Sequence, residues 1–207
     1  MLETLAMLKQ GGWPMAPLAV CSVLALAVIL ERVYALRRNR VIDPAVVQAL
    51  EAYRGEDSAA GTLIVCQRAR GPFARMAAGL LKQRHLHHDQ AIEAMHALGR
   101  SQIGELERGL TLLEIIAGIS PLIGLLGTVL GMVEVFNAIT ASGLGNPQVL
   151  SSGISKALVT TIGGLCVAIP ALAFYSLFSK RVDELAAEMQ DRATGFLLKL
   201  QSFQEED

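Results

Sequence analysis

Three long stretches without a charged side chain constrain this chain more than any other feature. They run from Gln10 to Leu30, from Ile115 to Val133 and from Ala157 to Ser179, and contain 21, 19 and 23 residues. A helix of about 20 apolar residues crosses the roughly 30 Å of hydrocarbon in a bilayer. Backbone groups in lipid must be paired within their own segment, so we expect three transmembrane helices. With 52% hydrophobic and 18% charged residues, the composition also indicates an all-α integral membrane protein.

The distribution of lysine and arginine predicts the orientation of these helices. Of the 18 Lys and Arg residues, 12 lie between Glu31 and Glu114 and 4 follow Ser179, which leaves only Lys9 and Lys156. Because positive residues favour the cytoplasmic side, we expect the N-terminus and the loop of residues 135–155 to face outward. The middle segment and the C-terminal tail are then cytoplasmic. The arginines that follow the first stretch favour an uncleaved anchor over a signal peptide, and they suggest contacts with anionic lipids.

The chain divides into three predicted parts: residues 1–36 with the first transmembrane helix, a cytoplasmic helical region at 37–100, and residues 101–207 with the other two. Glycines 55, 61 and 71 are expected to break the cytoplasmic region into short helices rather than a separate folded domain. From Asp89 onward no proline interrupts the helical spacing, which predicts one long helix continuing into the second span. The third span is expected to continue into the cytoplasm in the same way, with these apolar positions: Val182, Leu185, Met189, Phe196 and Leu200.

Small residues form a stripe on each of the later two spans, whereas the first span is rich in Leu and Val. Small residues allow helix backbones to approach closely, so both spans are expected to pack on protein and the first to face lipid. The stripes consist of Ala117, Ser120, Gly124, Gly127 and Gly131 in one span and Ala157, Thr161, Gly164, Ala168 and Ala171 in the other. Pro121 and Pro170 interrupt the two helices at mid-depth, where neighbouring polar groups can compensate for the kink, and they are candidates for shaping a central cavity.

Two threonines lie at matching depth in these spans. Thr128 is six residues inside Glu134, and Thr161 is five residues inside Lys156. At ~1.5 Å per residue, both hydroxyls lie roughly 8–9 Å below the outward surface, marked by those two charges. The matched depth favours a polar ring on an ion pathway over the simpler alternative, in which each Thr bonds to a carbonyl of its preceding turn. For Thr160, one residue off the stripe, packing or such a local bond is the preferred interpretation.

No Asp, Glu, His or Lys lies in the three uncharged stretches. Ion transport through a membrane usually requires an ionisable group there, so that group must come from another polypeptide. An enzyme is not expected, because Ser120 has no base beside it in the membrane. The net charge of −1 argues against nucleic acid as a partner. The four histidines (His85, His87, His88 and His96) fit a solvated surface better than a metal site, and we expect neither metal nor cofactor.

Two segments of the sequence resemble the signatures of the MotA/TolQ/ExbB proton-channel family, over roughly residues 100–190. The segment from Ser120 to Met132 has the sequence SPLIGLLGTVLGM, and that from Gly153 to Pro170 has the sequence GISKALVTTIGGLCVAIP. The closest resemblance is to ExbB-type proteins of the second type, which serve auxiliary TonB systems. Family members carry a Thr in each signature, and the matching positions are Thr128 and Thr161. Lys156 stands where ExbB and TolQ commonly carry Glu, so a role for that carboxylate does not transfer.

The resemblance implies a pentamer in the bacterial inner membrane, surrounding two copies of an ExbD-like single-span subunit that carries the titrating Asp. It further implies a TonB-like partner and a role in energising outer-membrane import with the proton motive force. Two alternatives remain open at this point: a TolQ- or MotA-like motor subunit for envelope integrity or motility, and a membrane scaffold that conducts no ion.

Overall fold

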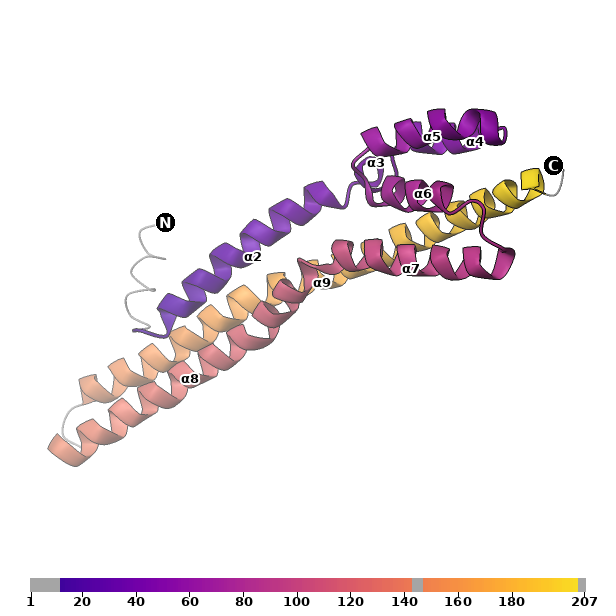
Figure 1. Ribbon diagram of the computed structural model, residues 1–207. Helices are drawn as coiled ribbons and strands as arrows, with labels where there is room; N and C mark the ends of the chain where they lie inside the picture. The colour runs from indigo at the N-terminus through magenta and orange to yellow at the C-terminus, as the bar shows by residue number, and fades with distance from the viewer. Residues whose placement is uncertain (1–11, 143–146, 205–207) are drawn as a thin grey trace. The chain divides into compact units, whose positions relative to one another are not determined.

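The computed structural model describes residues 12–142 and 147–204, and every regular element in them is a helix (Figure 1). The helices are α2 (Met15–Ala35), α3 (Arg38–Val41), α4 (Pro44–Glu51), α5 (Glu56–Arg68), α6 (Pro72–Lys82), α7 (His88–Glu107), α8 (Leu110–Ser142) and α9 (Pro147–Gln204). They fall into two compact units. Among the described residues, one unit contains those up to Leu30 and those between Leu110 and Ser176, and the other contains residues 31–109 and those from Leu177 onward.

Three helices are long and apolar enough to cross a membrane, which confirms the number of predicted spans. They are α2 over its full length, the part of α8 from Leu110 to Thr140, and α9 from Leu150 to Phe203. The helices extend beyond the uncharged stretches. In particular, α8 reaches Ser142 and α9 begins at Pro147, so most of the predicted outward loop is helical. Residues 143–146 and Gln10 lie outside the described residues.

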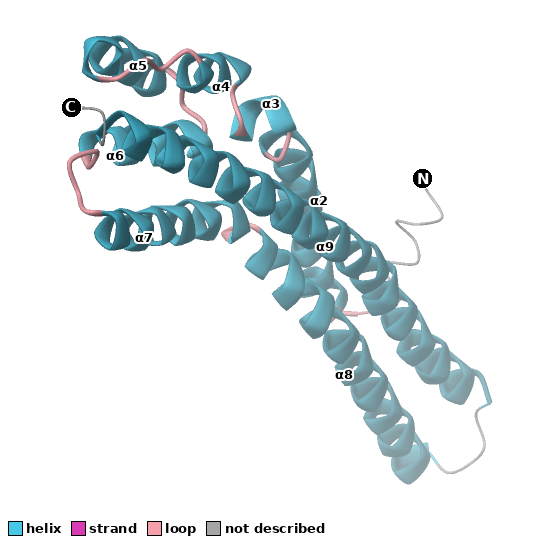
Figure 2. Cartoon of the chain, turned by 90° about the vertical axis from the view of Figure 1, so that its right-hand side faces the viewer, coloured by secondary structure: helices cyan, strands magenta, loops and turns pink. Residues whose placement is uncertain are grey.

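In the first unit, α8 and α9 run side by side along their small-residue stripes (Figures 1 and 2). The start of α2 packs on α9, where a Cβ added to Gly163 would lie 3.1 Å from the Met15 side chain and 3.7 Å from that of Leu18. Much of the rest of α2 carries exposed apolar side chains, among them Val20, Val23 and Leu26. The orientation of that surface toward lipid remains a prediction.

The prediction of one continuous helix from Asp89 into the second span is wrong. The helix is interrupted at Arg108 and Gly109, which separate α7 from α8. The Arg32 Nη1 donates a hydrogen bond of 2.8 Å to the Leu106 carbonyl, which a continuous helix would pair with the amide four residues on. The same guanidinium lies against Gly109, where a Cβ would clash with it. The Arg32 side chain, at the end of α2, therefore supplies the donor to the Leu106 carbonyl that the backbone of a continuous helix would supply.

The second unit consists of the short helices α3–α7 and the last part of α9. Consecutive helices from α4 to α7 contact one another. Asp43 caps α4 by accepting a 2.9 Å hydrogen bond from the Ala45 amide, and Pro44 follows it at the first helical position. Gly55 precedes α5 with φ of 84°, a conformation that favours glycine. Gly71 precedes α6, whereas Gly61 lies within α5 and does not break it.

The third span continues as expected, because α9 is a single helix of 58 residues. All five apolar positions predicted along its extension are buried. They form a core with α6 and α7 that includes Phe73, Met76 and Met95. Tyr53 completes it near the end of α9, with edge-to-face ring contacts of 5.5 Å to Phe196 and 5.9 Å to Phe203. The middle segment is thus helical as predicted, but it obtains its core by packing on the end of α9.

Candidate functional site

The site begins with the close approach of α8 and α9 along their glycines. A Cβ added to Gly124 would lie 3.0 Å from the Thr160 carbonyl, and one added to Gly131 would lie 2.9 Å from the Ala157 Cβ. The closest approach to backbone atoms involves Gly164, whose added Cβ would lie 2.6 Å from the Ser120 carbonyl and 3.1 Å from the Gly124 Cα. The backbones therefore touch where the small residues lie, which is how small residues stabilise helix pairs in membranes.

Thr160 lies inside this contact and is fully buried. Its hydroxyl donates to the Ala157 carbonyl at 2.7 Å, within its own helix. Its side chain fills the space beside Gly127, where any added Cβ would overlap it. The geometry of Thr160 is therefore that of a packing residue that satisfies its hydroxyl locally.

Thr161 makes a different contact from its neighbour. Its hydroxyl lies 3.3 Å from the Gly124 carbonyl, so it donates across the interface from α9 to α8. In a regular α-helix the carbonyl of residue 124 also accepts from the amide of residue 128. The acceptor of the Thr161 hydroxyl therefore belongs to the helical turn that carries Thr128. Thr161 itself is only partly buried, so part of its surface is exposed.

Thr128 follows the simpler alternative that the sequence left open for it. Its hydroxyl donates to the Leu125 carbonyl at 2.6 Å, in the preceding turn. The side chain is partly buried and lies one residue from Gly127, which packs against Thr160. The register of the two helices thus places Thr128 close to the height of Thr160 and Thr161. The two predicted threonines share a level, but neither donates a hydrogen bond to the other.

Ser120 and the two prolines lie deeper along the same helices. Ser120 is fully buried, and its hydroxyl has no hydrogen-bond partner among the described residues. Pro121 and Pro170 both lie within helices that continue on either side of them. Neither proline can donate to the carbonyl four residues before it, so each leaves one backbone acceptor free of its helical partner.

The two charges predicted at the outward rim form an ion pair within one chain. The Lys156 Nζ lies 2.8 Å from both carboxylate oxygens of Glu134. The Lys156 side chain also lies against Gly12, where a Cβ would be 2.6 Å from the Lys156 Cε. Gly12 has φ of 72° and precedes the first span. The pair therefore joins α8 and α9 next to the start of α2, at the end of both helices that we predict to face outward.

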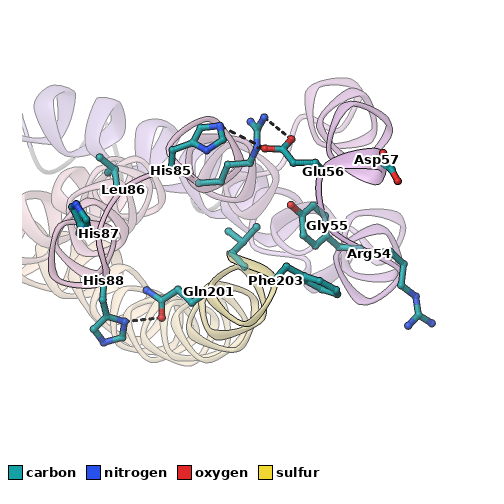
Figure 3. A pocket seen from close by; sticks show the side chains of 13 residues that line it. Arg54, Gly55, Glu56, Asp57, His85, Leu86, His87, His88, Gln201 and Phe203 are labelled. Carbon is teal, nitrogen blue, oxygen red and sulfur yellow. Dashed lines mark hydrogen bonds and ion pairs between the residues drawn. The ribbon is translucent and has the colours of Figure 1, made fainter. Parts of the chain in front are cut away.

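Three of the four histidines, His85, His87 and His88, line a cleft of about 970 Å³ in the second unit, with polar groups from three separate segments (Figure 3). Arg84 donates two hydrogen bonds to Glu56, of 2.9 and 2.8 Å, and these hold the pKa of the Glu56 carboxyl below its usual value. The His85 Nε2 lies 3.6 Å from the same carboxylate, and the His88 Nδ1 lies 2.6 Å from Gln201. In the part of the chain that the structure describes, no three His, Cys, Asp or Glu side chains come together as metal ligands.

These features define a multi-pass helical membrane protein with two glycine-packed spans that carry hydroxyls but no charge between their rims. Comparison with known proteins agrees with that class. A sequence model of the MotA/TolQ/ExbB proton channel family matches residues 68–191. The chain is similar to the ExbB-like 1 biopolymer transport protein of Synechocystis, with 34% identity over 185 residues that cover 86% of this chain and 73% of the relative.

Other similar proteins carry ExbB and TolQ names. The biopolymer transport protein exbB1 of Vibrio cholerae is 31% identical over 195 residues, which cover 91% of this chain and 85% of the relative. The Tol-Pal system protein TolQ of Haemophilus influenzae is 36% identical over 94 residues, 45% of this chain and 41% of that protein. The chain therefore belongs to the MotA/TolQ/ExbB proton channel family and is ExbB-like. It is a proton-channel subunit of the energy-transducing kind, rather than an enzyme.

Sequence reasoning found most of these residues but missed two relationships. It did not find the hydrogen bond from Thr161 to Gly124, because spacing along one helix says nothing about the acceptor on another. It also missed the contact of Arg32 with Leu106 and Gly109. A signal for that contact existed, since Gly109 is a poor helix former placed directly before a span.

Proposed function

We propose that this chain is the ion-conducting stator subunit of an inner-membrane complex that uses the proton motive force to energise TonB-dependent outer-membrane import. In this proposal five copies surround two copies of an ExbD-like single-span subunit, and the N-terminus faces outward. The energy of the proton motive force is transferred to a TonB-like protein. The names of the ExbB relatives and the family match support this assignment.

The observation that carries the proposal is the Thr161 hydroxyl, which bonds to the Gly124 carbonyl in the turn that bears Thr128. Each hydroxyl accepts as well as donates, so the two can pass a hydrogen bond to water or to a partner's group on their open side. Neither threonine titrates near neutral pH. The proposed carboxylate of the partner therefore accepts the proton, and the threonines position the water or ion that delivers it.

Protonation explains how such a complex can produce motion. A charged carboxylate is costly in an apolar interior, and neutralising it removes most of that cost. Each charge that crosses ~100 mV supplies ~2.3 kcal/mol, so a few protons in each cycle are enough to move the partner pair against the ring. The uncharged lining of α8 and α9 suits this role because it contains no fixed charge to trap the carboxylate.

A paired substitution tests the proposal directly. We expect Thr128→Val/Thr161→Val to remove most proton flux from vesicles reconstituted with the ExbD-like subunit, while the oligomer remains assembled. The matched control is Thr140→Val, because Thr140 also donates to its preceding turn, at 2.9 Å to the Asn137 carbonyl, but lies beyond Glu134. Undiminished flux in the double variant contradicts the role of the threonines. Absence of flux in the assembled wild-type complex favours the scaffold alternative.

A further inference from the structure

Two arginines gather on one tyrosine ring at the end of the first span. The Arg40 guanidinium carbon lies 3.7 Å from the centre of the Tyr34 ring, and that of Arg37 lies 5.4 Å from it. The Arg40 Nη2 also donates to the Tyr34 hydroxyl at 2.5 Å. Both distances to the ring fall within the range of cation–π interactions. The ring thus holds two positive charges close together.

The backbone around this cluster fixes where the arginines project. Between the end of α2 and the start of α4, a run of four exposed residues, 37–40, is flanked by the buried apolar residues Leu36, Val41 and Ile42. The Gly71 backbone lies close to the Arg40 carbonyl, since a Cβ added to Gly71 would be 2.6 Å from that oxygen. The arginine side chains are therefore exposed, while the segment that carries them is packed.

Neither arginine of the cluster has an acidic partner among the described residues. In contrast, Arg32 lies 2.7 Å from Glu31, and Arg38 forms an ion pair with Glu188. Two guanidinium groups on one ring repel each other, and an anion between them would offset that repulsion. Arginine is also the side chain best suited to bind phosphate, because its planar fork donates two parallel hydrogen bonds.

The position of the ring indicates which anion is available. Tyr34 is the last residue but one of α2, an apolar helix of 21 residues. Such a helix is about 31 Å long and spans the hydrocarbon, so Tyr34 lies at the level of the lipid headgroups. Its side chain is 50% exposed and that of Val33 is 48% exposed, so an apolar surface continues from the arginines along the helix. A phospholipid can contact the arginines with its headgroup and the apolar surface with its acyl chain. A small soluble anion can contact only the arginines.

We propose that Tyr34, Arg37 and Arg40 form a binding site for the headgroup phosphate of an anionic phospholipid, with an acyl chain along the exposed face at the end of α2. The two guanidinium groups bind the phosphate, and the tyrosine ring holds them in place. This site is separate from the threonines of α8 and α9, so it stands whether or not they conduct ions.

Native mass spectrometry of the delipidated full-length protein, after addition of phosphatidylglycerol or phosphatidylcholine, tests the site. We expect wild type to retain phosphatidylglycerol in preference, and Arg37→Gln/Arg40→Gln to lower its retention by about tenfold. The charge-matched control is Arg54→Gln/Lys82→Gln, which removes two positive side chains that are exposed elsewhere in the same unit. This control should retain the lipid as wild type does. Circular dichroism and thermal melting establish that each variant keeps its helical fold.

Three outcomes would overturn the proposal. One is equal retention of phosphatidylglycerol by wild type and the folded Arg37→Gln/Arg40→Gln variant. Another is an equal loss in the control pair, which shows that total charge and not the cluster binds the lipid. The third is displacement of phosphatidylglycerol by millimolar inorganic phosphate, which assigns the site to a soluble anion. A further variant, Tyr34→Leu, keeps both charges but removes the ring, and we expect it to lower retention by less than the double arginine variant.

Discussion

The Lys156 ammonium lies 2.8 Å from both carboxylate oxygens of Glu134, and the two residues belong to the same chain. The pair lies about one turn beyond Thr160 and Thr161, at the end of the α8–α9 contact that is predicted to face outward. ExbB and TolQ proteins commonly carry a Glu where this chain has Lys156. Here the Glu134 carboxylate on α8 pairs with the lysine on α9. This end of the two helices therefore carries an ion pair rather than a single negative charge.

We predict that this pair couples the two helices but contributes modestly to stability. In a double-mutant cycle of Glu134→Gln and Lys156→Met, the coupling should be below about 1 kcal/mol, because the side chains are 57% and 31% exposed and are partly screened by water. Thermal unfolding of the purified protein in detergent measures it. The charge-reversed double variant Glu134→Lys/Lys156→Glu should melt closer to wild type than either reversal alone. If both single reversals melt like wild type, the pair is not formed.

The glycine contact of α8 and α9 should tolerate no added methyl group where the backbones of the two helices meet. We expect Gly164→Ala to destabilise the protein by ~1–3 kcal/mol, because its Cβ would meet the Ser120 carbonyl and the Gly124 backbone, neither of which can rotate away. Gly118 is the matched control, since nothing lies within 4 Å of an added Cβ there. Gly118→Ala should be neutral or slightly stabilising. Comparable melting temperatures for the two variants would argue against direct backbone contact.

We predict that valine substitutions of the neighbours Thr160 and Thr161 have different effects on proton flux. Valine has nearly the shape of threonine, so Thr160→Val and Thr161→Val both keep the side-chain volume. We expect Thr161→Val to lower proton flux by at least about tenfold, since the loss of one hydrogen bond in a rate-limiting step amounts to ~1.4 kcal/mol. Thr160→Val should conduct nearly as wild type, because its hydroxyl bonds only within its own helix. The opposite ranking in reconstituted vesicles would place the pathway on the other face of α9.

The Cys66 thiol should be unreactive near neutral pH. It is buried in α5, and burial raises its pKa to about 11, because the thiolate is the form that loses most by leaving water. The reactive thiolate is therefore scarce at pH 7.5 and increases about tenfold with each pH unit up to the pKa. Mass spectrometry after maleimide treatment should find Cys66 labelled only at high pH or after denaturation. Labelling at pH 7.5 as fast as that of an unstructured cysteine peptide would contradict the burial.

The spans of this protein could be predicted from the sequence because they depend on local properties. An uncharged stretch of about 20 residues must be helical in lipid, whatever surrounds it. The small-residue stripes likewise identify the faces that pack, since only Gly, Ala, Ser and Thr permit close approach. The number of spans and the continuous course of α9 were predicted correctly for these reasons.

Other features depend on groups that are far apart in the sequence, and the tertiary structure alone decided them. The end of α7 is set by a side chain 74 residues earlier, because Arg32 takes the Leu106 carbonyl. Thr160 and Thr161 are neighbours with similar side chains, yet one bonds within α9 and the other to α8. Periodicity specifies the face of a helix on which a residue lies, but the acceptor for its hydroxyl depends on the rotation and register of the opposite helix.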